Sequence, residues 1–493
     1  MRKIFEPQMT FGQTPIDQIK IDMRARDEIP KLLLGLQHIY CDKELREKVF
    51  TILKNVIPED TDSKNGRPGM DLWKVLVMGT IRLNCNWDYD KLQEMVNNHK
   101  TLRQMLGHGM MDDDDTYPLQ TLKDNIRLLT PDILDKINTL VVQEGHNLMM
   151  KKKTSDDEAL IGRCDSFVVE TNVHFPTDIN LLFDAVRKMI QIAAIISQGI
   201  GTSMWRQSAY NIKTFKRLYR IVQRLKHSTS KDEKKKAKKA RQIMDAYEEY
   251  IELAEKYILK AKITIEMTDP SDIMNAVRAE EVQTYINYAL WQIDLIKRRV
   301  LQDEKIPHKE KIFSIFEPHT EWISKGKAGV PQELGLRVCI LEDQYGFILH
   351  HQVMEKETDD KVAVAMVTSA QNKFSDLKGC SFDKGFYTPG NKKDLKDTLD
   401  ILVLPKKGRC NKAECEEETA EDFIRLKRKH SAVESAINGL ENHGLDRCPD
   451  HGIQGFKKYV GLSVLARNLQ IMGHHIQQKG LKQLQRSEQR KAS

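Results

Sequence analysis

The sequence is poor in the features that mark secreted and membrane proteins. Eight cysteines are scattered over 493 residues, which is typical of a reducing compartment and excludes a disulfide scaffold. No apolar run reaches the roughly 18 residues that a membrane-spanning helix needs. Arg2 and Lys3 are not followed by the apolar segment of a secretory signal. We therefore expect a cytoplasmic protein with no membrane partner.

Disorder of the whole chain is also excluded. Hydrophobic residues make up 40% of the sequence and charged residues 30%, so the chain can bury a sizeable core. At about 150 residues per domain, the length predicts about three domains.

The net charge of +7 is unevenly distributed. The segment 213–241 has 13 basic and two acidic residues, a local charge of +11, so the rest of the chain sums to −4. Such a block fits a polyphosphate partner. The alternative is a solvated helical face next to a lysine-rich connection.

One helix of this segment separates its cations from its apolar residues. Four cations, Lys213, Arg217, Arg220 and Arg224, follow one another at intervals of 4, 3 and 4, which places them on a single helical face. A second, apolar stripe consists of Phe215, Leu218, Val222 and Leu225. With Lys216 added, this face is predicted to contact DNA phosphates.

The first 155 residues have helical patterns. Two short predicted helices, at 71–83 and 89–97, are joined by the polar turn at 84–87. This arrangement is typical of a helix-turn-helix that reads the major groove, and equally of two helices in an ordinary bundle.

The second half alternates between strand and helix patterns. The predicted elements are a strand at 162–171, a helix at 179–196, a helical segment at 201–307, a hairpin at 336–342 and 347–354, a helix at 360–374, a strand at 377–382, a helix at 389–399, a strand at 401–404, and helices at 422–440 and 459–477. Without the helical segment, this is the element order of the RNase H-like fold. In that fold the first and fourth strands lie side by side and parallel.

Three acidic residues fall at notable points of this pattern. Asp165 lies within the first strand, Asp383 ends the fourth, and Glu434 is on the long helix after the fifth. Residues on neighbouring parallel strands and at their carboxyl ends converge on one crevice. Three carboxylates there suit two Mg²⁺ ions, which take oxygen ligands and can hold both the attacking and the leaving oxygen of a phosphodiester. Each acid alone could instead be a buried polar residue, a turn residue or a solvated helix residue.

Longer blocks around these acids resemble DDE-type insertion-sequence transposases. The segment from Cys164 to Asp178 is similar to their first-aspartate block, and Phe382 to Tyr387 to their second. Arg428 to Asn438 is similar to their glutamate helix, and the stretch from Gly444-Leu445-Asp446-Arg447 to Asn468-Leu469 to their closing region. The resemblance covers roughly residues 160–475.

The resemblance implies that Asp165, Asp383 and Glu434 are catalytic and bind Mg²⁺, with Mn²⁺ as a substitute. It implies double-stranded DNA as the partner, both element ends and target, bound by a nucleoid-associated homodimer. Many relatives carry a Tyr-x2-Arg-x3-Glu-x6-Lys signature, whereas this chain has Lys427, His430, Glu434 and Glu441. His430 is therefore expected to replace the arginine in part as a DNA contact.

The expected architecture is an α/β RNase H-like catalytic domain interrupted by an all-α insertion, with an all-α N-terminal domain. Its segments are 1–155 for the N-terminal, DNA-binding domain, 156–200 and 308–477 for the catalytic domain, 201–307 for the basic insertion and 478–493 for a flexible basic tail.

Two rival functions stay open, a nuclease without strand transfer and a non-catalytic DNA-binding relative. A zinc site formed by Cys410, Cys415, Cys448 and His451 is a further alternative, although the usual closely spaced cysteine pairs are absent.

Overall fold

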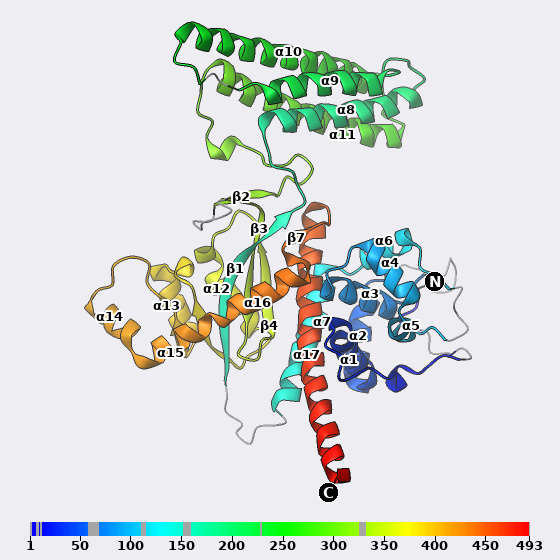
Figure 1. Ribbon diagram of the computed structural model, residues 1–493, viewed down its shortest axis with the longest axis vertical. Coiled ribbons are helices and arrows are strands. Elements are labelled where there is room, and N and C mark those ends of the chain that lie inside the picture. Colours follow the sequence, from blue (N-terminus) through cyan, green and yellow to red (C-terminus); the bar gives the residue numbers. More distant parts are fainter. Residues whose placement is uncertain are drawn as a thin grey trace. The chain divides into compact units, whose positions relative to one another are not determined.

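A mixed seven-stranded sheet lies in the larger of two structural units (Figure 1). The computed structural model describes residues 2–5, 9, 12–57, 69–109, 115–150, 159–226, 229–324 and 332–492, and the statements below concern these residues. The larger unit combines Met1–Asn172 with Ile323–Ser493, and the smaller is Val173–Trp322. None of the described helices is both long and apolar enough to cross a membrane.

The central strands of the sheet are β1 (Leu160–Thr171) and β5 (Leu377–Phe382), which run parallel to each other. On one side, β3 (Gln332–Glu342) pairs antiparallel with β1, and β4 (Ile348–Met354) antiparallel with β3. On the other side, β6 (Ile401–Val403) is parallel to β5. The short strands β2 (Glu321–Ser324) and β7 (Arg447–Cys448) pair with β3 and β1. The predicted parallel pairing of the first and fourth strands of the pattern is confirmed.

Helices from both ends of the sequence share one hydrophobic core with the sheet. The N-terminal helices are α1 (Glu28–Cys41), α2 (Lys43–Lys54), α3 (Leu72–Asn84), α4 (Tyr89–Asn98), α5 (Lys100–Met105), α6 (Leu119–Ile126) and α7 (Pro131–Met150). The later ones are α12 (Asp359–Gln371), α13 (Pro389–Thr398), α16 (Ala432–Leu440) and α17 (Gly452–Ala492). The helices α14 (Lys412–Thr419) and α15 (Glu421–His430) have no buried residue. Because α17 packs on α1, α3 and α7, the segment 1–155 is joined to the sheet in one unit rather than forming a separate domain.

The two helices of the expected helix-turn-helix are α3 and α4. Every residue of α3 except Lys74 is buried, which makes it a core helix. The exposed side of α4 carries Asp90 and Glu94 against Lys91, so it offers no net positive charge to a phosphate backbone. The bundle interpretation therefore fits these two helices better.

The C-terminal helix α17 continues through the segment expected to be a flexible tail. It runs to Ala492 without a break at 478. Residues there are mostly good helix formers, and the helix is also held from outside. Gln477 donates to the Ala25 carbonyl oxygen at 2.8 Å, and Arg24 pairs with Glu488 at 2.8 Å.

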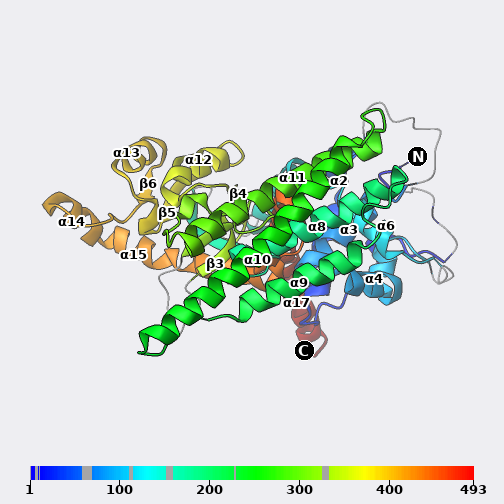
Figure 2. The ribbon, with the colours of Figure 1, turned by 90° about the horizontal axis from the view of Figure 1, so that it is seen from above.

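The smaller unit contains four helices that run side by side, α8 (Asp178–Gly199), α9 (Ser208–Arg224), α10 (Glu233–Glu266) and α11 (Ile273–Ile296) (Figure 2). They bury a hydrophobic core of their own. The unit therefore begins before α8, whereas the sequence placed 156–200 in the catalytic domain and began the insertion at 201. The reason is the apolar face of α8, which packs on α9, α10 and α11. The N-cap of α8 is Thr177, which forms a capping box with Asn180.

Candidate active site

The register of β1 and β5 brings two of the three predicted catalytic acids next to each other. Cys164 of β1 is paired with Phe382 of β5, and the next residues along the two parallel strands are Asp165 and Asp383. Cys164 is buried and lies 3.5 Å from Cys339, sulfur to sulfur. Because side chains alternate along a strand, Asp165 faces the opposite side of the sheet from this core.

The helix that carries the third acid is interrupted. A single helix was predicted at 422–440, but the structure ends α15 at His430 and begins α16 at Ala432. α15 packs on β5 and β6, and α16 packs on β1. Val433, Ala436 and Leu440 form the buried side of α16, which leaves Glu434 on its exposed side.

The three acids are close enough to influence one another electrostatically. Burial, together with the negative charges of Asp383, Asp359 and Glu434, raises the pKa of Asp165 to about 6. A hydrogen bond from the Ser166 backbone N–H to Asp165 Oδ1, at 2.7 Å, acts in the opposite direction. A carboxylate crowded by like charges gains from any cation that enters the site.

Asp359 is a fourth acid of this site that the sequence analysis did not identify. It is the first residue of α12, and its Oδ1 accepts a hydrogen bond from Ser166 Oγ at 2.6 Å. Gly385, two residues after Asp383, is so close that a Cβ there would lie 3.1 Å from Asp359 Oδ2. In the sequence, Asp359 and Asp360 have the ordinary appearance of acids in a first helical turn, so only the packing of α12 on β1 reveals the position of Asp359.

His430, the residue expected to contact DNA, lies at the same site. Its Nδ1 is 3.0 Å from Ser381 Oγ on β5. Burial lowers the pKa of His430, while the charges of Asp383 and Glu434 act to raise it. The imidazole is therefore directed toward the sheet and the acids, and its side chain is only half-buried.

The donor set at this site consists of carboxylates, which are the ligands that Mg²⁺ takes. Within the described part of the chain, no three His, Cys, Asp or Glu side chains are placed closely enough to hold a metal ion. The fit to a metal therefore rests on the chemistry of the acids and on the raised pKa of Asp165. The same observation gives no support to the zinc alternative, since Cys410, Cys415, Cys448 and His451 form no such group within the described residues.

The predicted cationic face lies on α9, in the smaller unit. Phe215, Leu218 and Val222 form the buried side of this helix, as predicted, whereas Leu225 follows its end. The five cations, Lys213, Lys216, Arg217, Arg220 and Arg224, are all exposed. No ion pair joins any of them to a carboxylate within the described residues. Together with Tyr210, Thr214 and Ile221 they line a shallow hollow of about 460 Å³.

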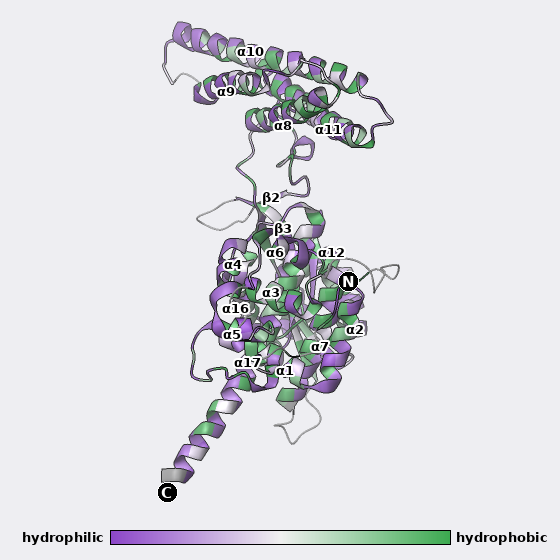
Figure 3. Ribbon diagram, turned by 90° about the vertical axis from the view of Figure 1, so that its right-hand side faces the viewer, coloured by the Kyte–Doolittle hydropathy of each residue, from purple (hydrophilic) through white to green (hydrophobic). Residues whose placement is uncertain are grey.

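The start of α10 adds a second group of cations. Lys234, Lys235 and Lys236 are exposed in its first turn, and Figure 3 shows this end of α10 as a long hydrophilic stretch. The positive end of the helix dipole disfavours cations there, and only Asp232, which caps the helix, and Glu233 offset it. A polyanionic partner would relieve this repulsion.

Comparison of the chain with protein-family models, with curated proteins and with solved structures finds no match.

Proposed function

We propose that this protein is a DNA transposase, an Mg²⁺-dependent enzyme that cuts phosphodiester bonds at the ends of an insertion element and joins the strands to target DNA. The observation that carries the proposal is the adjacency of Asp165 and Asp383 on parallel neighbouring strands, with the Glu434 helix packed on the same strand β1. The raised pKa of Asp165 supports mutual proximity of all three acids.

The proposed fold of the catalytic part is RNase H-like. The strand order β4-β3-β1-β5-β6 supports it. In this order β3 is antiparallel to both β4 and β1, whereas β1, β5 and β6 run parallel to one another. The bundle α8–α11 is inserted after β1, which agrees with an insertion between the first two strands of this order.

In this proposal Asp165, Asp383 and Glu434 hold the metal ions, and Asp359 is a further carboxylate within reach of the same site. Bound Mg²⁺ would supply Lewis-acid stabilisation of the attacking and leaving oxygens. Ser166 orients Asp359 through its hydroxyl and Asp165 through its backbone N–H. His430, beside Asp383 and Glu434, would bind the DNA strand that enters the site.

The cationic face of α9 is the proposed surface for double-stranded DNA. Unpaired, exposed guanidinium and ammonium groups on one helical face release counterions when they meet phosphates, and they need no particular base sequence. The apolar groups Tyr210 and Ile221, 65% and 44% exposed, lie among these cations and could pack against sugars.

The test uses a supercoiled plasmid that carries the coding region with its natural flanking DNA, incubated with the protein and Mg²⁺ or Mn²⁺. The proposal expects nicks or breaks at two fixed sites flanking the gene and new joints between these ends and other DNA. Cleavage at such sites without joined products would favour a nuclease. Binding without cleavage would favour a non-catalytic relative, for which no residue of the site offers specific support.

A further inference from the structure

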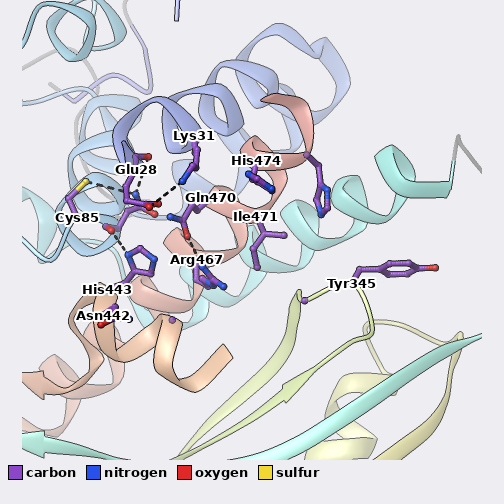
Figure 4. A pocket seen from close by; sticks show the side chains of 14 residues that line it. Glu28, Lys31, Cys85, Tyr345, Asn442, His443, Arg467, Gln470, Ile471 and His474 are labelled. Carbon is purple, nitrogen blue, oxygen red and sulfur yellow. Dashed lines mark hydrogen bonds and ion pairs between the residues drawn. The ribbon is translucent and has the colours of Figure 1, made fainter. Parts of the chain in front are cut away.

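A second hollow in the larger unit is lined by a half-buried cation that the proposed catalysis does not use (Figure 4). Its volume is about 660 Å³, within the range of small-molecule sites. Its walls come from α1, the end of α3, α16, the π-helical turn Glu441–Leu445, α17 and the β3–β4 turn.

The cation is Arg467, in the middle of α17. Burial lowers the pKa of its guanidinium, while Glu342 and Glu28 act to raise it. The guanidinium donates to Gln470 Oε1 at 2.8 Å, and no carboxylate forms an ion pair with it among the residues described. It also lies against Gly439, where an added Cβ would be 3.1 Å from Arg467 Cζ. A half-buried guanidinium that lines a hollow and has no carboxylate partner among the described residues is suited to bind an anion.

The other basic groups of the hollow point to the same kind of ligand. Lys31 contributes an ammonium group, and His443 and His474 contribute imidazoles, which are labelled in Figure 4. Burial lowers the pKa of both histidines, and the charge of Arg467 lowers it further. An anion bound beside Arg467 would offset its charge and so raise the pKa of both histidines again.

Two buried acceptors distinguish this hollow from a general anion site. Among the described residues, Glu28 Oε2 and Asn84 Oδ1 have no hydrogen-bond partner, although both atoms are buried and Asn84 is only 1% exposed. Glu28 Oε1 already accepts from Lys31 at 3.2 Å. A fitting ligand must therefore present negative charge to Arg467 and Lys31 and an O–H donor to Glu28 and Asn84.

We propose that this hollow binds a phosphate group that retains a proton, either free inorganic phosphate or the monoester end of a nucleotide. A protonated phosphate offers both anionic oxygens and a P–OH donor. Sulfate and phosphodiesters have no such donor, and their oxygens would be repelled by the Glu28 carboxylate. The site is thus distinct in chemistry from a DNA-backbone contact, and it stands whether or not the protein cuts DNA.

The test is calorimetric titration of the full chain, at about pH 6, with inorganic phosphate, adenosine 5′-monophosphate, sulfate and dimethyl phosphate. Near this pH a phosphomonoester still carries its second proton in part. Phosphate or the monoester should bind at least about tenfold more tightly than sulfate or the diester. Tighter binding of the monophosphate than of phosphate would identify the nucleotide as the ligand, and the reverse would identify free phosphate.

Two variants test separately the binding of negative charge by Arg467 and the binding of the P–OH group by Glu28. Arg467→Gln should weaken phosphate binding about tenfold or more, whereas Arg425→Gln, on the exposed surface of α15, should not change it. Glu28→Gln should bring sulfate to within about threefold of phosphate, because the amide can donate where the carboxylate repels. This second variant keeps the test decisive if Arg467→Gln does not fold. Equal affinity for sulfate and phosphate in the native chain would overturn the proposal.

Discussion

Replacing Asp165 with asparagine should make the protein more stable at neutral pH. The site holds Asp165 among three other carboxylates, and its pKa is raised from 3.8 to about 6. Between these two values the native state binds more protons than the unfolded state, so the free energy of unfolding falls as pH rises from about 4 to 6. Above about pH 6 the stability that the protonated Asp165 contributes is fully lost.

The size of the effect follows from the pKa change. At about 1.4 kcal/mol per pKa unit, the ionised carboxylate costs the native state about 3 kcal/mol at most. Partial access of solvent to the side chain reduces this to about 1–3 kcal/mol. Asparagine keeps an oxygen that can accept the 2.7 Å hydrogen bond from Ser166, so the substitution removes the charge without the contact.

The assay is urea unfolding of the native chain and Asp165→Asn at pH 4 and pH 7.5, with and without Mg²⁺. The variant should be more stable by about 1–3 kcal/mol at pH 7.5 and nearly equal at pH 4. Mg²⁺ should stabilise the native chain and have much less effect on the variant. Asp376→Asn, at an exposed aspartate just before β5, is the control and should show neither change. A variant that is less stable at pH 7.5 would refute the electrostatic reasoning.

Three further predictions concern other parts of the molecule. The change of Arg217, Arg220 and Arg224 to Gln should weaken binding to specific and random duplexes alike and flatten the salt dependence by about two to three units, as measured by fluorescence anisotropy; an unchanged slope would move the DNA surface elsewhere. Gly473→Ala should destabilise the larger unit by about 2–3 kcal/mol, because the new Cβ would lie 1.7 Å from the Lys31 carbonyl oxygen where α17 meets α1. Gly480→Ala should be neutral or stabilising when both variants are compared by thermal unfolding, because the nearest neighbour of its new Cβ is the flexible Met23 side chain at 3.4 Å. Equal losses of stability in the two variants would contradict this account. Burial lowers the pKa of His350 to about 3 and that of His351 to about 4, so stability should be lost as pH falls from about 6.5 toward 4, by up to about 1.4 kcal/mol per pH unit for each imidazole. A double His350→Gln, His351→Gln variant should lose this dependence in pH-resolved denaturation, and an unchanged dependence would assign it to other groups.

The strands β1, β3, β4, β5 and β6 and the positions of Asp165 and Asp383 could be predicted because they depend on local patterns, whereas the short strands β2 and β7 were not predicted. The period-two alternation from 336 and the apolar run at 401–404 are properties of neighbouring residues, and the strand predicted at 377–382 has the bounds of β5. Asp165 and Asp383 could be placed because each lies at a fixed point of a strand. Their adjacency required only the parallel pairing of those strands, which β1 and β5 have.

The parts that could not be predicted depend on contacts between distant segments. Asp359 reaches the site only because α12 begins beside β1, where Ser166 donates to it. The assignment of α8 to the smaller unit depends on which partners cover its apolar face, and those partners lie later in the chain. The helical course of 478–492 likewise depends partly on contacts with residues near the N-terminus, Met23 and Arg24 among them.

The most direct test of the central claim is cleavage of the plasmid with natural flanking DNA by the Asp165→Asn, Asp383→Asn and Glu434→Gln variants. Each should reduce Mg²⁺-dependent cleavage by about 10³-fold or more while leaving DNA affinity within a few fold of the native value. Asp422→Asn, on the exposed surface of α15, is the matched control and should cut normally. Normal cleavage by any of the three acid variants would contradict the assignment of these carboxylates as the catalytic site.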